Sequence, residues 1–335
     1  MTDQFDRVME KYLVPMSEFK GPVMDSTYFF RKGGSFVFAE GYCHPPGAFW
    51  GMIIKYPHPQ GHIDVFGRPY SWTHREYVNG ELAIIPFHRQ VENQFVVAPE
   101  LKAIRGDNPP YAKNYVKFPL SDFTGFFDSR RSMKLLRRGY EWVDKAVKET
   151  CELLETDPDG TGVTGSMVYG RAEDDIDLVF INDPKENDRI ATRLRAFLRE
   201  RPEARVKELG KVWALRFYYA GTLICPFFRY AAPDQIPILT CEMEVLKNAV
   251  GVEATVSDDL HGYYLPAILG LTGVKRGSRR LEDMELIVYH GAMRGDFYRG
   301  EKIRLKADLV AVTTPRKGKR RALLVTDMAE VVKLT

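Results

Sequence analysis

Two aspartates separated by one residue, Asp175 and Asp177, are the residues of this 335-residue chain that are best placed to do chemistry. They stand in the stretch DIDLVFI (175–181), which alternates acidic and apolar residues and then becomes apolar throughout. On a β-strand, residues i and i+2 point to the same face, so both carboxylates would project together. Adjacent carboxylates repel each other, and a bound divalent cation relieves that repulsion. Because oxygen ligands suit Mg²⁺ or Mn²⁺, the pair predicts a site for one of these ions.

A Gly-Ser pair, Gly165 and Ser166, precedes the aspartates and adds a second feature to the candidate site. Glycine lets the backbone approach a ligand closely. Ser166 stands where a short helix could begin, and its hydroxyl together with the free N–H groups of that helix start would hold a phosphate. Either feature alone is common, but the two together, between a helix and a buried strand, indicate a phosphate beside a metal ion.

The elements that must position these residues can be traced on both sides of them. Apolar residues recur in steps of three and four from Leu136 to Leu154, which predicts one amphipathic helix that ends before the loop DPDGTG (157–162). Asp183 can cap a second helix, and Pro184 suits the first turn of that helix. The stretches KVWALRFYYAG (211–221) and TLICPFFRY (222–230) predict two strands around a tight turn.

The order helix, strand, Gly-Ser pair, short helix and Asp-x-Asp strand resembles the DNA polymerase β-like nucleotidyltransferase superfamily over about residues 130–232. The resemblance implies that Asp175 and Asp177 are catalytic and bind two Mg²⁺ or Mn²⁺ ions, and that Gly165 and Ser166 contact the triphosphate of an NTP substrate. It implies in-line attack of a hydroxyl on the α-phosphate. Arg171 is then expected to neutralise phosphate charge.

Two further stretches, FVFAEGYCHPPG (36–47) and KYPHPQGHIDVFGRPY (55–70), together with the β-rich tail, are similar to a group of uncharacterised prokaryotic predicted nucleotidyltransferases. This second resemblance implies no activity of its own.

One feature of the superfamily is missing. Its third metal-binding carboxylate lies on a later strand, and the corresponding stretch, TLICPFFRY, has Cys225 near the expected place and no acid. A thiol is a poor ligand for Mg²⁺. Glu242 and Glu244, which share a face of the next predicted strand, are the alternative metal ligands. Only eight residues separate Ser166 from Asp175, fewer than is usual in the superfamily, so the intervening loop must be tight.

Two function hypotheses follow. The first is a Mg-dependent nucleotidyltransferase that moves a nucleoside monophosphate from an NTP to a hydroxyl acceptor, which is an RNA 3′ end, a protein or a small molecule. The alternative is a catalytically degenerate nucleotidyltransferase fold that acts as a nucleic-acid or nucleotide-binding protein, and Cys225 in place of an acid favours it. Toxin or antitoxin components of the same superfamily are a third possibility, for which no residue argues directly.

Basic residues gather in four clusters, although the net charge is only +3. Phosphate-backbone contacts to RNA or another nucleic acid are one explanation, and an ordinary solvated surface is the other. The residues predicted to bind nucleic acid are Arg137 and Arg138 before the Gly-Ser pair, and Arg316, Lys317, Lys319 and Arg320 in a turn near the C-terminus. The remaining two clusters lie at Arg189–Arg199 and Lys275–Arg280.

The chain as a whole is predicted to be α+β, with three domains. Residues 1–128 form a β-rich N-terminal domain, 129–232 a nucleotidyltransferase-like α/β domain, and 233–335 a C-terminal small β-barrel-like domain. The N-terminal elements expected are a helix over 3–13 and strands at 35–42, 49–56 and 62–72, with HPQG (58–61) as the hairpin turn between the last two. The C-terminal elements expected are a hairpin of 238–246 and 252–258 around KNAVG, an alternating strand over 303–312, and a turn at 315–320 that leads into 322–327.

Composition excludes several protein classes. The four cysteines are far apart and form no CxxC pair, so neither a disulfide framework nor a structural zinc site is expected. The N-terminus mixes both charge signs and does not resemble a signal peptide. Since no apolar run approaches 18 residues, no membrane partner is expected. We therefore expect a cytoplasmic protein with free thiols. The sequence does not specify the oligomeric state, the nucleotide or the acceptor.

Overall fold

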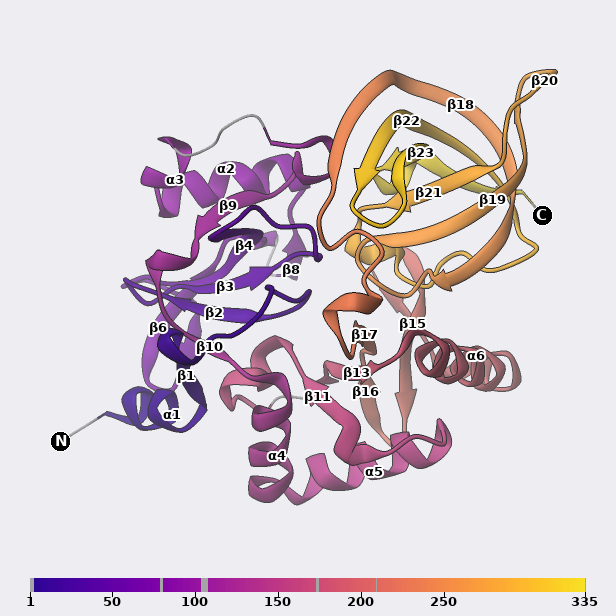
Figure 1. The fold of residues 1–335 in the computed structure, drawn as a ribbon. Helices are drawn as coiled ribbons and strands as arrows, with labels where there is room; N and C mark the ends of the chain where they lie inside the picture. The colour runs from indigo at the N-terminus through magenta and orange to yellow at the C-terminus, as the bar shows by residue number, and fades with distance from the viewer. Residues whose placement is uncertain (1–2, 79–80, 104–107, 173–174, 209, 335) are drawn as a thin grey trace.

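Three sets of sheets follow one another along the chain in the computed structural model, which describes residues 3–78, 81–103, 108–172, 175–208 and 210–334 (Figure 1). An eight-stranded sheet comes first, two small sheets occupy the centre, and a seven-stranded sheet completes the chain. Helices are concentrated in the central part. The fold is therefore α+β, as predicted.

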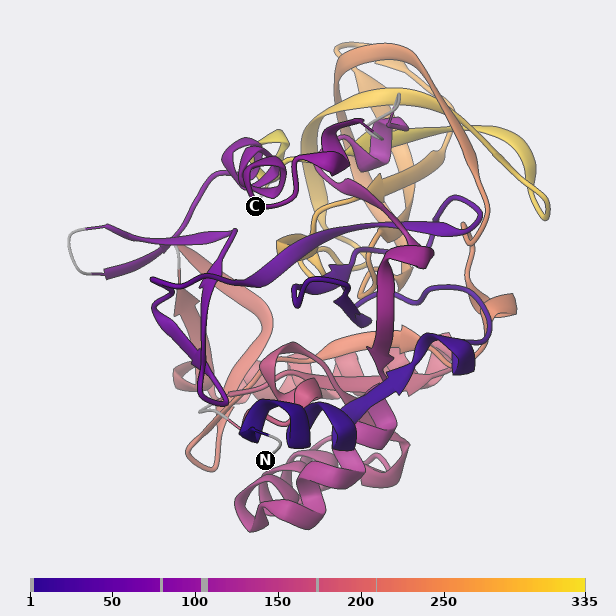
Figure 2. The same ribbon diagram turned by 90° about the vertical axis from the view of Figure 1, so that its left-hand side faces the viewer.

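The N-terminal sheet has the strand order β1-β10-β2-β3-β4-β6-β5, with β9 paired to β4, while β7 and β8 form a separate hairpin. Figure 2 shows this sheet from its own side, with α1 beneath it near the central helices. The elements are α1 (Gln4–Tyr12), β1 (Leu13–Pro15), β2 (Tyr28–Arg31), β3 (Phe36–Ala39), β4 (Ala48–Pro57), β5 (Ile63–Val65), β6 (Arg68–Trp72), β7 (Arg75–Val78), β8 (Glu81–Ile84), α2 (Phe87–Val97), α3 (Glu100–Ala103), β9 (Val116–Pro119) and β10 (Phe123–Phe127).

The predicted helix over 3–13 is confirmed, but two N-terminal predictions are wrong. The stretch 62–72 is not one strand, because Phe66 and Gly67 take left-handed backbone angles (φ 54° and 86°) and turn the chain between β5 and β6. No hairpin forms at the HPQG turn, because β4 pairs with β6 and not with β5, the strand that follows this turn. The hairpin therefore forms around Phe66-Gly67, one turn later than predicted.

The central part contains the predicted strands and helices, but the long helix and the strand over 222–230 are each divided into two. One helix was expected from Leu136 to Leu154, but Tyr140 is extended (φ −137°, ψ 108°) and divides it into two. Asp183 caps the next helix by accepting from the N–H groups of Lys185 and Glu186. The elements are α4 (Ser129–Gly139), α5 (Glu141–Leu153), β11 (Thr161–Val163), the 3-10 helix η5 (Gly165–Tyr169), β12 (Asp175–Ile176), β13 (Leu178–Asn182), α6 (Pro184–Glu200), β14 (Arg205–Glu208), β15 (Lys211–Tyr219), β16 (Thr222–Ile224) and β17 (Phe227–Tyr230).

Two neighbouring strands break at the same level in this central part. Strand β12 pairs in parallel with β16, and strand β13 pairs in parallel with β17. Between them, the Cys225 N–H donates to the Ile176 carbonyl at 2.9 Å. Pro226 follows and has no N–H to continue the ladder. Asp177 and Cys225 consequently lie opposite each other at the interruption, where neither residue belongs to a strand.

The C-terminal strands close into a ring, because β18 pairs with β19 on one side and with β22 on the other. Figure 1 shows β18 curving around this barrel. The elements are β18 (Glu242–His261), β19 (Ala267–Arg276), β20 (Arg279–Arg280), β21 (Met284–Val288), β22 (Lys302–Thr314), β23 (Gly318–Val325) and β24 (Val331–Leu334).

The predicted hairpin around KNAVG is wrong, because β18 runs through this stretch without turning back. Ala249 takes a left-handed conformation (φ 52°), and its N–H donates to Asp308 Oδ1 at 2.9 Å. The pairing of β18 with β22 shifts register here, so the five residues form a bulge that bends one long strand. The alternation predicted over 303–312 is confirmed only over 303–307, because Val310, Ala311 and Val312 are all buried.

The hydrophobic cores cross the predicted domain boundaries. One core joins α1 and the N-terminal sheet to η5, β13 and α6. Another joins Trp50 and Met52 to Ile287 and Leu324 of the C-terminal barrel. The domain boundaries at 128/129 and 232/233 therefore stay a prediction. None of the helices in the described ranges is long and apolar enough to cross a membrane.

Candidate metal and nucleotide site

The structure brings Asp175, Asp177 and Cys225 together. One ligand atom from each of the three side chains lies within 4.8 Å of the other two. Asp175 lies on β12, and Asp177 and Cys225 lie at the strand break described above. The sequence therefore predicted correctly that the two aspartates lie side by side, and Cys225 lies beside them.

Gly165 packs directly against the carboxylate of Asp177. Its backbone is left-handed (φ 66°), and a Cβ at this position would collide with the Asp177 Oδ2 atom. The preceding residue, Thr164, donates its N–H to the Asp177 carbonyl at 3.0 Å. Glycine is thus required twice here, for its backbone angle and for the close approach. Ser166 follows in η5, so the Gly-Ser pair adjoins the aspartates as predicted.

The helix expected at Ser166 is only the five-residue 3-10 helix η5. So short a helix lacks the summed dipole that favours an anion at a longer α-helix. Arg171 follows Gly170, and its N–H lies 3.4 Å from the Ser166 carbonyl. Arg171 does not line the cavity that contains the aspartates. The structure therefore does not place the predicted phosphate-neutralising arginine in the site.

Three other arginines line that cavity, which we call the aspartate cavity. It has a volume of about 260 Å³ and is lined by Arg75, Asp175, Asp177, Glu208, Trp213, Leu215, Arg216, Cys225, Pro226, Phe227, Gly291 and Arg294. Arg75 comes from β7 of the N-terminal region, Arg216 from β15, and Arg294 from the loop before β22. Sequence reasoning missed all three because they are distant along the chain from the Asp-x-Asp motif and from one another.

Arg216 is the residue that contacts the Cys225 thiol. Its Nε donates to Cys225 Sγ at 3.0 Å, and its guanidinium also pairs with Glu208. The same guanidinium lies 5.1 Å from the ring centre of Trp213. Burial, and then the charge of Asp177, raise the pKa of Cys225, so the thiol stays neutral at physiological pH. A neutral thiol is not a ligand for Mg²⁺.

Asp177 holds its proton more tightly than an ordinary aspartate. Burial raises its pKa to about 7, the charge of Asp175 adds to the rise, and Arg216 opposes it. Two carboxylates in one cavity disfavour ionisation of both. A divalent cation bound between them would displace this proton, because carboxylate ligands must be deprotonated. The donor set of two carboxylates fits Mg²⁺ or Mn²⁺, whereas Cys225 does not.

Arg294 carries positive charge into the cavity from the C-terminal part of the chain. It pairs with Asp25 at 2.8 Å, and the two side chains are only 10% and 1% exposed. Asp25 also accepts from the Gly41 N–H at 2.8 Å. Nearby, burial raises the pKa of Glu40 to about 8, although Arg294 opposes that rise. The Asp25–Arg294 pair thus fixes a guanidinium at the wall of the aspartate cavity.

Glu242 and Glu244 do not supply the missing acid. Both are exposed at the start of β18, where they pair with Thr313 and Ala311 of β22. Neither belongs to the group around Asp177 nor lines the aspartate cavity. They were proposed because period-two spacing places them on one face, and the structure shows that this face is solvent-exposed.

The predicted nucleic-acid-binding residues fall into two separate places. On α4, Arg138 is exposed, whereas Arg137 is only 14% exposed and pairs at 2.8 Å with both Asp144 and Asp159. Arg137 therefore has a structural role. Near the C-terminus, Lys317 and Arg320 each contact Glu285 at 2.7 Å, Arg316 donates to the Asp234 carbonyl, and Lys319 is exposed.

Comparison with known proteins adds no family assignment. No protein-family model matches the chain, and neither the curated proteins nor the solved structures gave a match. The superfamily resemblance therefore stays a prediction from the Gly-Ser and Asp-x-Asp motifs.

Proposed function

We propose that the protein is a nucleotidyltransferase that moves a nucleoside monophosphate from a metal-bound NTP to a hydroxyl acceptor, on a central domain of the polymerase β-like type. The observation that carries this proposal is the aspartate cavity. It combines two adjacent carboxylates with three guanidinium groups. A divalent cation needs the first, and a triphosphate needs the second. A metal–triphosphate complex satisfies both parts of the cavity at once.

Each residue has a definite part in this proposal. Asp175 and Asp177 would hold Mg²⁺ or Mn²⁺, which supplies positive charge to the reacting phosphate when bound. Gly165 keeps the backbone clear of the Asp177 carboxylate, and Ser166 contacts the triphosphate. Arg75 and Arg294 balance the remaining phosphate charge. In the transfer, a bond forms from the acceptor oxygen to the α-phosphorus, the bond to pyrophosphate breaks, and the hydroxyl proton leaves to water.

The acceptor is an RNA 3′ end, a protein or a small molecule, and we propose that the protein acts in the cytoplasm. Cys225 favours a second candidate, a degenerate transferase fold that binds nucleotide without transferring it. The neutral Cys225 thiol, hydrogen-bonded to Arg216, leaves the described cluster with two acids where the superfamily uses three. Such a site would bind a metal-bound nucleotide and activate an attacking hydroxyl poorly.

A label-transfer assay separates the two candidates. Each α-³²P-labelled NTP is incubated with the protein, Mg²⁺ or Mn²⁺, and either total RNA or whole-cell protein as acceptor. The transferase proposal expects label in one acceptor class, and loss of that label with the Asp175→Asn/Asp177→Asn variant. The matched control is Asp234→Asn, an exposed aspartate outside the cavity, which should keep full activity.

Nucleotide binding is measured in parallel by equilibrium dialysis with the same labelled NTPs. Binding that depends on Asp175 and Asp177, without any transfer, supports the degenerate fold. Absence of both binding and transfer, from protein shown to be folded by circular dichroism, would contradict both candidates.

A further inference from the structure

We propose that a groove along α4, distinct from the aspartate cavity, binds the sugar–phosphate backbone of a single nucleic-acid strand. This inference goes beyond the proposed transfer and does not depend on it, because binding to the groove requires neither Asp175 nor Asp177.

The groove consists of two adjoining cavities of about 410 and 580 Å³. They share Glu18, Phe126, Asp128 and Arg130, so they form one continuous depression, which we call the α4 groove. One end lies at Arg229 on β17, and the other lies at Arg138 in the last turn of α4. A ligand that fills it must be longer than a single phosphate group.

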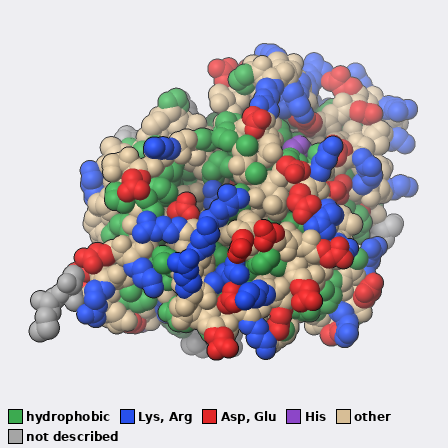
Figure 3. Space-filling model, turned by 60° about the horizontal axis from the view of Figure 1, so that its bottom comes forward, with side chains coloured by type: hydrophobic (Ala, Val, Ile, Leu, Met, Phe, Trp, Pro, Cys, Tyr) green, Lys and Arg blue, Asp and Glu red, His purple; other side chains and the backbone are tan. Residues whose placement is uncertain are grey.

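Cations outnumber acids along the α4 groove by six to two. The acids are Glu18 and Asp128, and Asp128 is already used to cap α4 by accepting from the Arg131 N–H at 2.7 Å. The cations are Lys20, Arg130, Arg131, Lys134, Arg138 and Arg229. In the space-filling view, a stripe of Lys and Arg side chains crosses the face that carries the central helices (Figure 3). This charge fits a polyanion.

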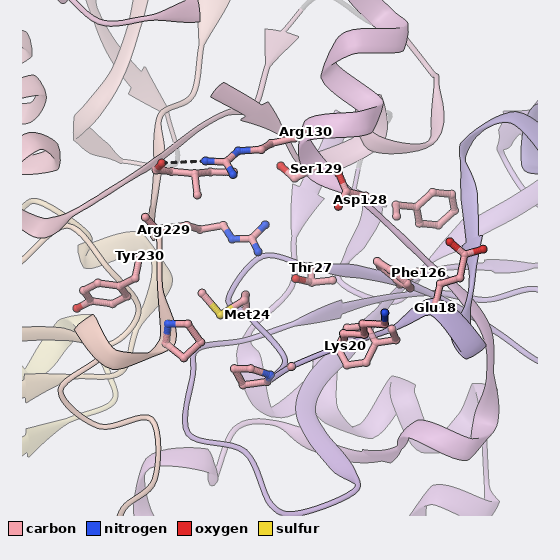
Figure 4. A pocket seen from close by; sticks show the side chains of 17 residues that line it. Glu18, Lys20, Met24, Thr27, Phe126, Asp128, Ser129, Arg130, Arg229 and Tyr230 are labelled. Carbon is pink, nitrogen blue, oxygen red and sulfur yellow. Dashed lines mark hydrogen bonds between the residues drawn. The ribbon is translucent and has the colours of Figure 1, made fainter. Parts of the chain in front are cut away.

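Three of the cations form a row. Arg130, Lys134 and Arg138 are four residues apart on α4, so they share one face of the helix. The row spans about 12 Å, since each residue of an α-helix rises about 1.5 Å. All three are exposed and none forms an ion pair with a described residue, although Arg130 donates from Nη2 to the Ile181 carbonyl at 3.2 Å (Figure 4). Evenly spaced cations without ion pairs suit successive phosphates of a strand better than one compact anion.

Arg229 marks the closed end of the groove. Its Nε atom is buried and has no hydrogen-bond partner among the described residues. Figure 4 shows its side chain extending from β17 into the cavity, in the space between Arg130 and Thr27. Burial lowers the pKa of the Arg229 guanidinium, although the charges of nearby groups, Asp25 and Asp128 among them, oppose the change. A half-buried guanidinium whose Nε atom has no described hydrogen-bond partner is incompletely stabilised, and a phosphate would pair with it.

Aromatic side chains favour a nucleic acid over an acidic protein. Phe19 and Phe126 line the groove, are half-buried, and lie edge to face with ring centres 5.1 Å apart. Exposed ring surface beside a row of cations is the combination that proteins use to stack bases and hold the backbone of a single strand. A carboxylate-rich peptide would use the cations and leave the exposed part of both rings uncovered.

The test is fluorescence anisotropy with a fluorescein-labelled, mixed-sequence, single-stranded RNA of 20 nucleotides, at several salt concentrations. The test variant is Arg130→Gln/Lys134→Gln/Arg138→Gln. The matched control, Lys145→Gln/Lys302→Gln/Lys306→Gln, removes the same charge from exposed positions outside the groove. We expect the test variant to lose affinity roughly 10- to 100-fold and its salt slope to fall by about 2, because each single-strand phosphate contact contributes about 0.7 to that slope.

The proposal would be overturned by a lack of RNA binding by the unmodified protein, by equal losses in the two triple variants, or by full competition from polyglutamate of the same charge. Inorganic phosphate could also displace the RNA from the unmodified protein but not from Arg229→Gln. This result would assign the pocket to a small phosphate ligand and would likewise overturn the proposal. Asp175→Asn/Asp177→Asn should bind RNA like the unmodified protein. Failure of the transfer assay and failure of the groove are therefore seen separately.

Discussion

The paired strands β13 and β17 have a different chemistry at each end. At their start, Asp177 and Phe227 line the aspartate cavity, where acids and arginines are mixed. At their end, Ile181 and Arg229 line the α4 groove, where cations dominate. Mixed charge suits a metal ion with its bound phosphates, whereas an excess of cations suits a phosphate chain without a metal. Charge balance, more than total charge, therefore distinguishes the two phosphate sites that we propose along this small sheet.

The largest predicted effect is on metal binding in the aspartate cavity. Asp177→Asn should weaken Mn²⁺ binding by about 100-fold or more, since even residues that merely orient metal ligands contribute 10- to 100-fold. Mn²⁺ affinity of the unmodified protein should rise with pH up to about 7, where Asp177 loses its proton. Isothermal titration calorimetry between pH 5.5 and 8 measures both.

The same group gives a sign for stability without metal. Because the pKa of Asp177 is raised to about 7, the folded protein binds a proton that the unfolded chain has already released between the ordinary aspartate pKa and pH 7. The free energy of unfolding should therefore fall as pH rises through this window. Melting curves of the Asp177→Asn variant should show a smaller fall than those of the unmodified protein. Parallel curves would contradict the raised pKa of Asp177.

A smaller effect is expected at Gly165. Gly165→Ala strains a left-handed residue and pushes the Asp177 carboxylate, so transfer should slow by roughly 10- to 100-fold, as misplacement by about an ångström can do. Gly47→Ala is a matched control, because Gly47 has a similar φ of 68° and open space around it. Both variants should lose stability from backbone strain, Gly165→Ala should lose more because its Cβ also collides with Asp177, and only Gly165→Ala should lose activity. Equal activity would show that the contact with Asp177 is unimportant.

Cys225→Asp adds a third carboxylate beside Asp175 and Asp177 in the aspartate cavity. The new carboxylate would face Arg216 and both aspartates, and Mn²⁺ affinity should rise about tenfold, or about 1.4 kcal/mol. Cys225→Ser, which changes size little and adds no charge, should leave the affinity unchanged. A decrease with Cys225→Asp would show that Arg216 already fills the position of the third acid and its metal.

The smallest predicted effect distinguishes Arg138, which lines the α4 groove, from its neighbour Arg137. Arg138→Gln should lower RNA affinity by about threefold to fivefold, as loss of one phosphate contact does, and leave stability unchanged. Arg137→Gln should leave RNA affinity unchanged and lower the free energy of unfolding by about 1–2 kcal/mol, because it removes charged hydrogen bonds to Asp144 and Asp159. Anisotropy and urea melts of the two variants check this. The opposite pattern would place Arg137 in the groove.

Local patterns predicted the parts of the site that are close in sequence. The spacing of Asp175 and Asp177, the Gly-Ser pair and the cap at Asp183 each depend on a few consecutive residues, and the structure places all of them as expected. The resemblance to the nucleotidyltransferase superfamily directed attention to Cys225. For Asp175 and Asp177, backbone periodicity alone determines that the two side chains share a face.

The rest depends on contacts between distant parts of the chain, which periodicity does not contain. Arg75 and Arg294 reach the aspartate cavity from the N-terminal and C-terminal regions. Arg229 and Lys20 lie 209 residues apart and line the same groove. The bulge at Ala249 was mistaken for a turn because it depends on Asp308, far along the chain. Lys20 and Arg229 had no sequence signal, since each is isolated among uncharged neighbours or opposite charges.

The shared cores also have a consequence for biosynthesis. Trp50, Met52 and Tyr111 of the N-terminal region are covered by Ile287 and Leu324 of the barrel, which are translated long after them. An apolar face that is made early therefore stays uncovered until the barrel strands are translated. Such exposed surface in a nascent chain promotes aggregation and calls for chaperones. We expect the nascent chain to need protection until the barrel strands emerge.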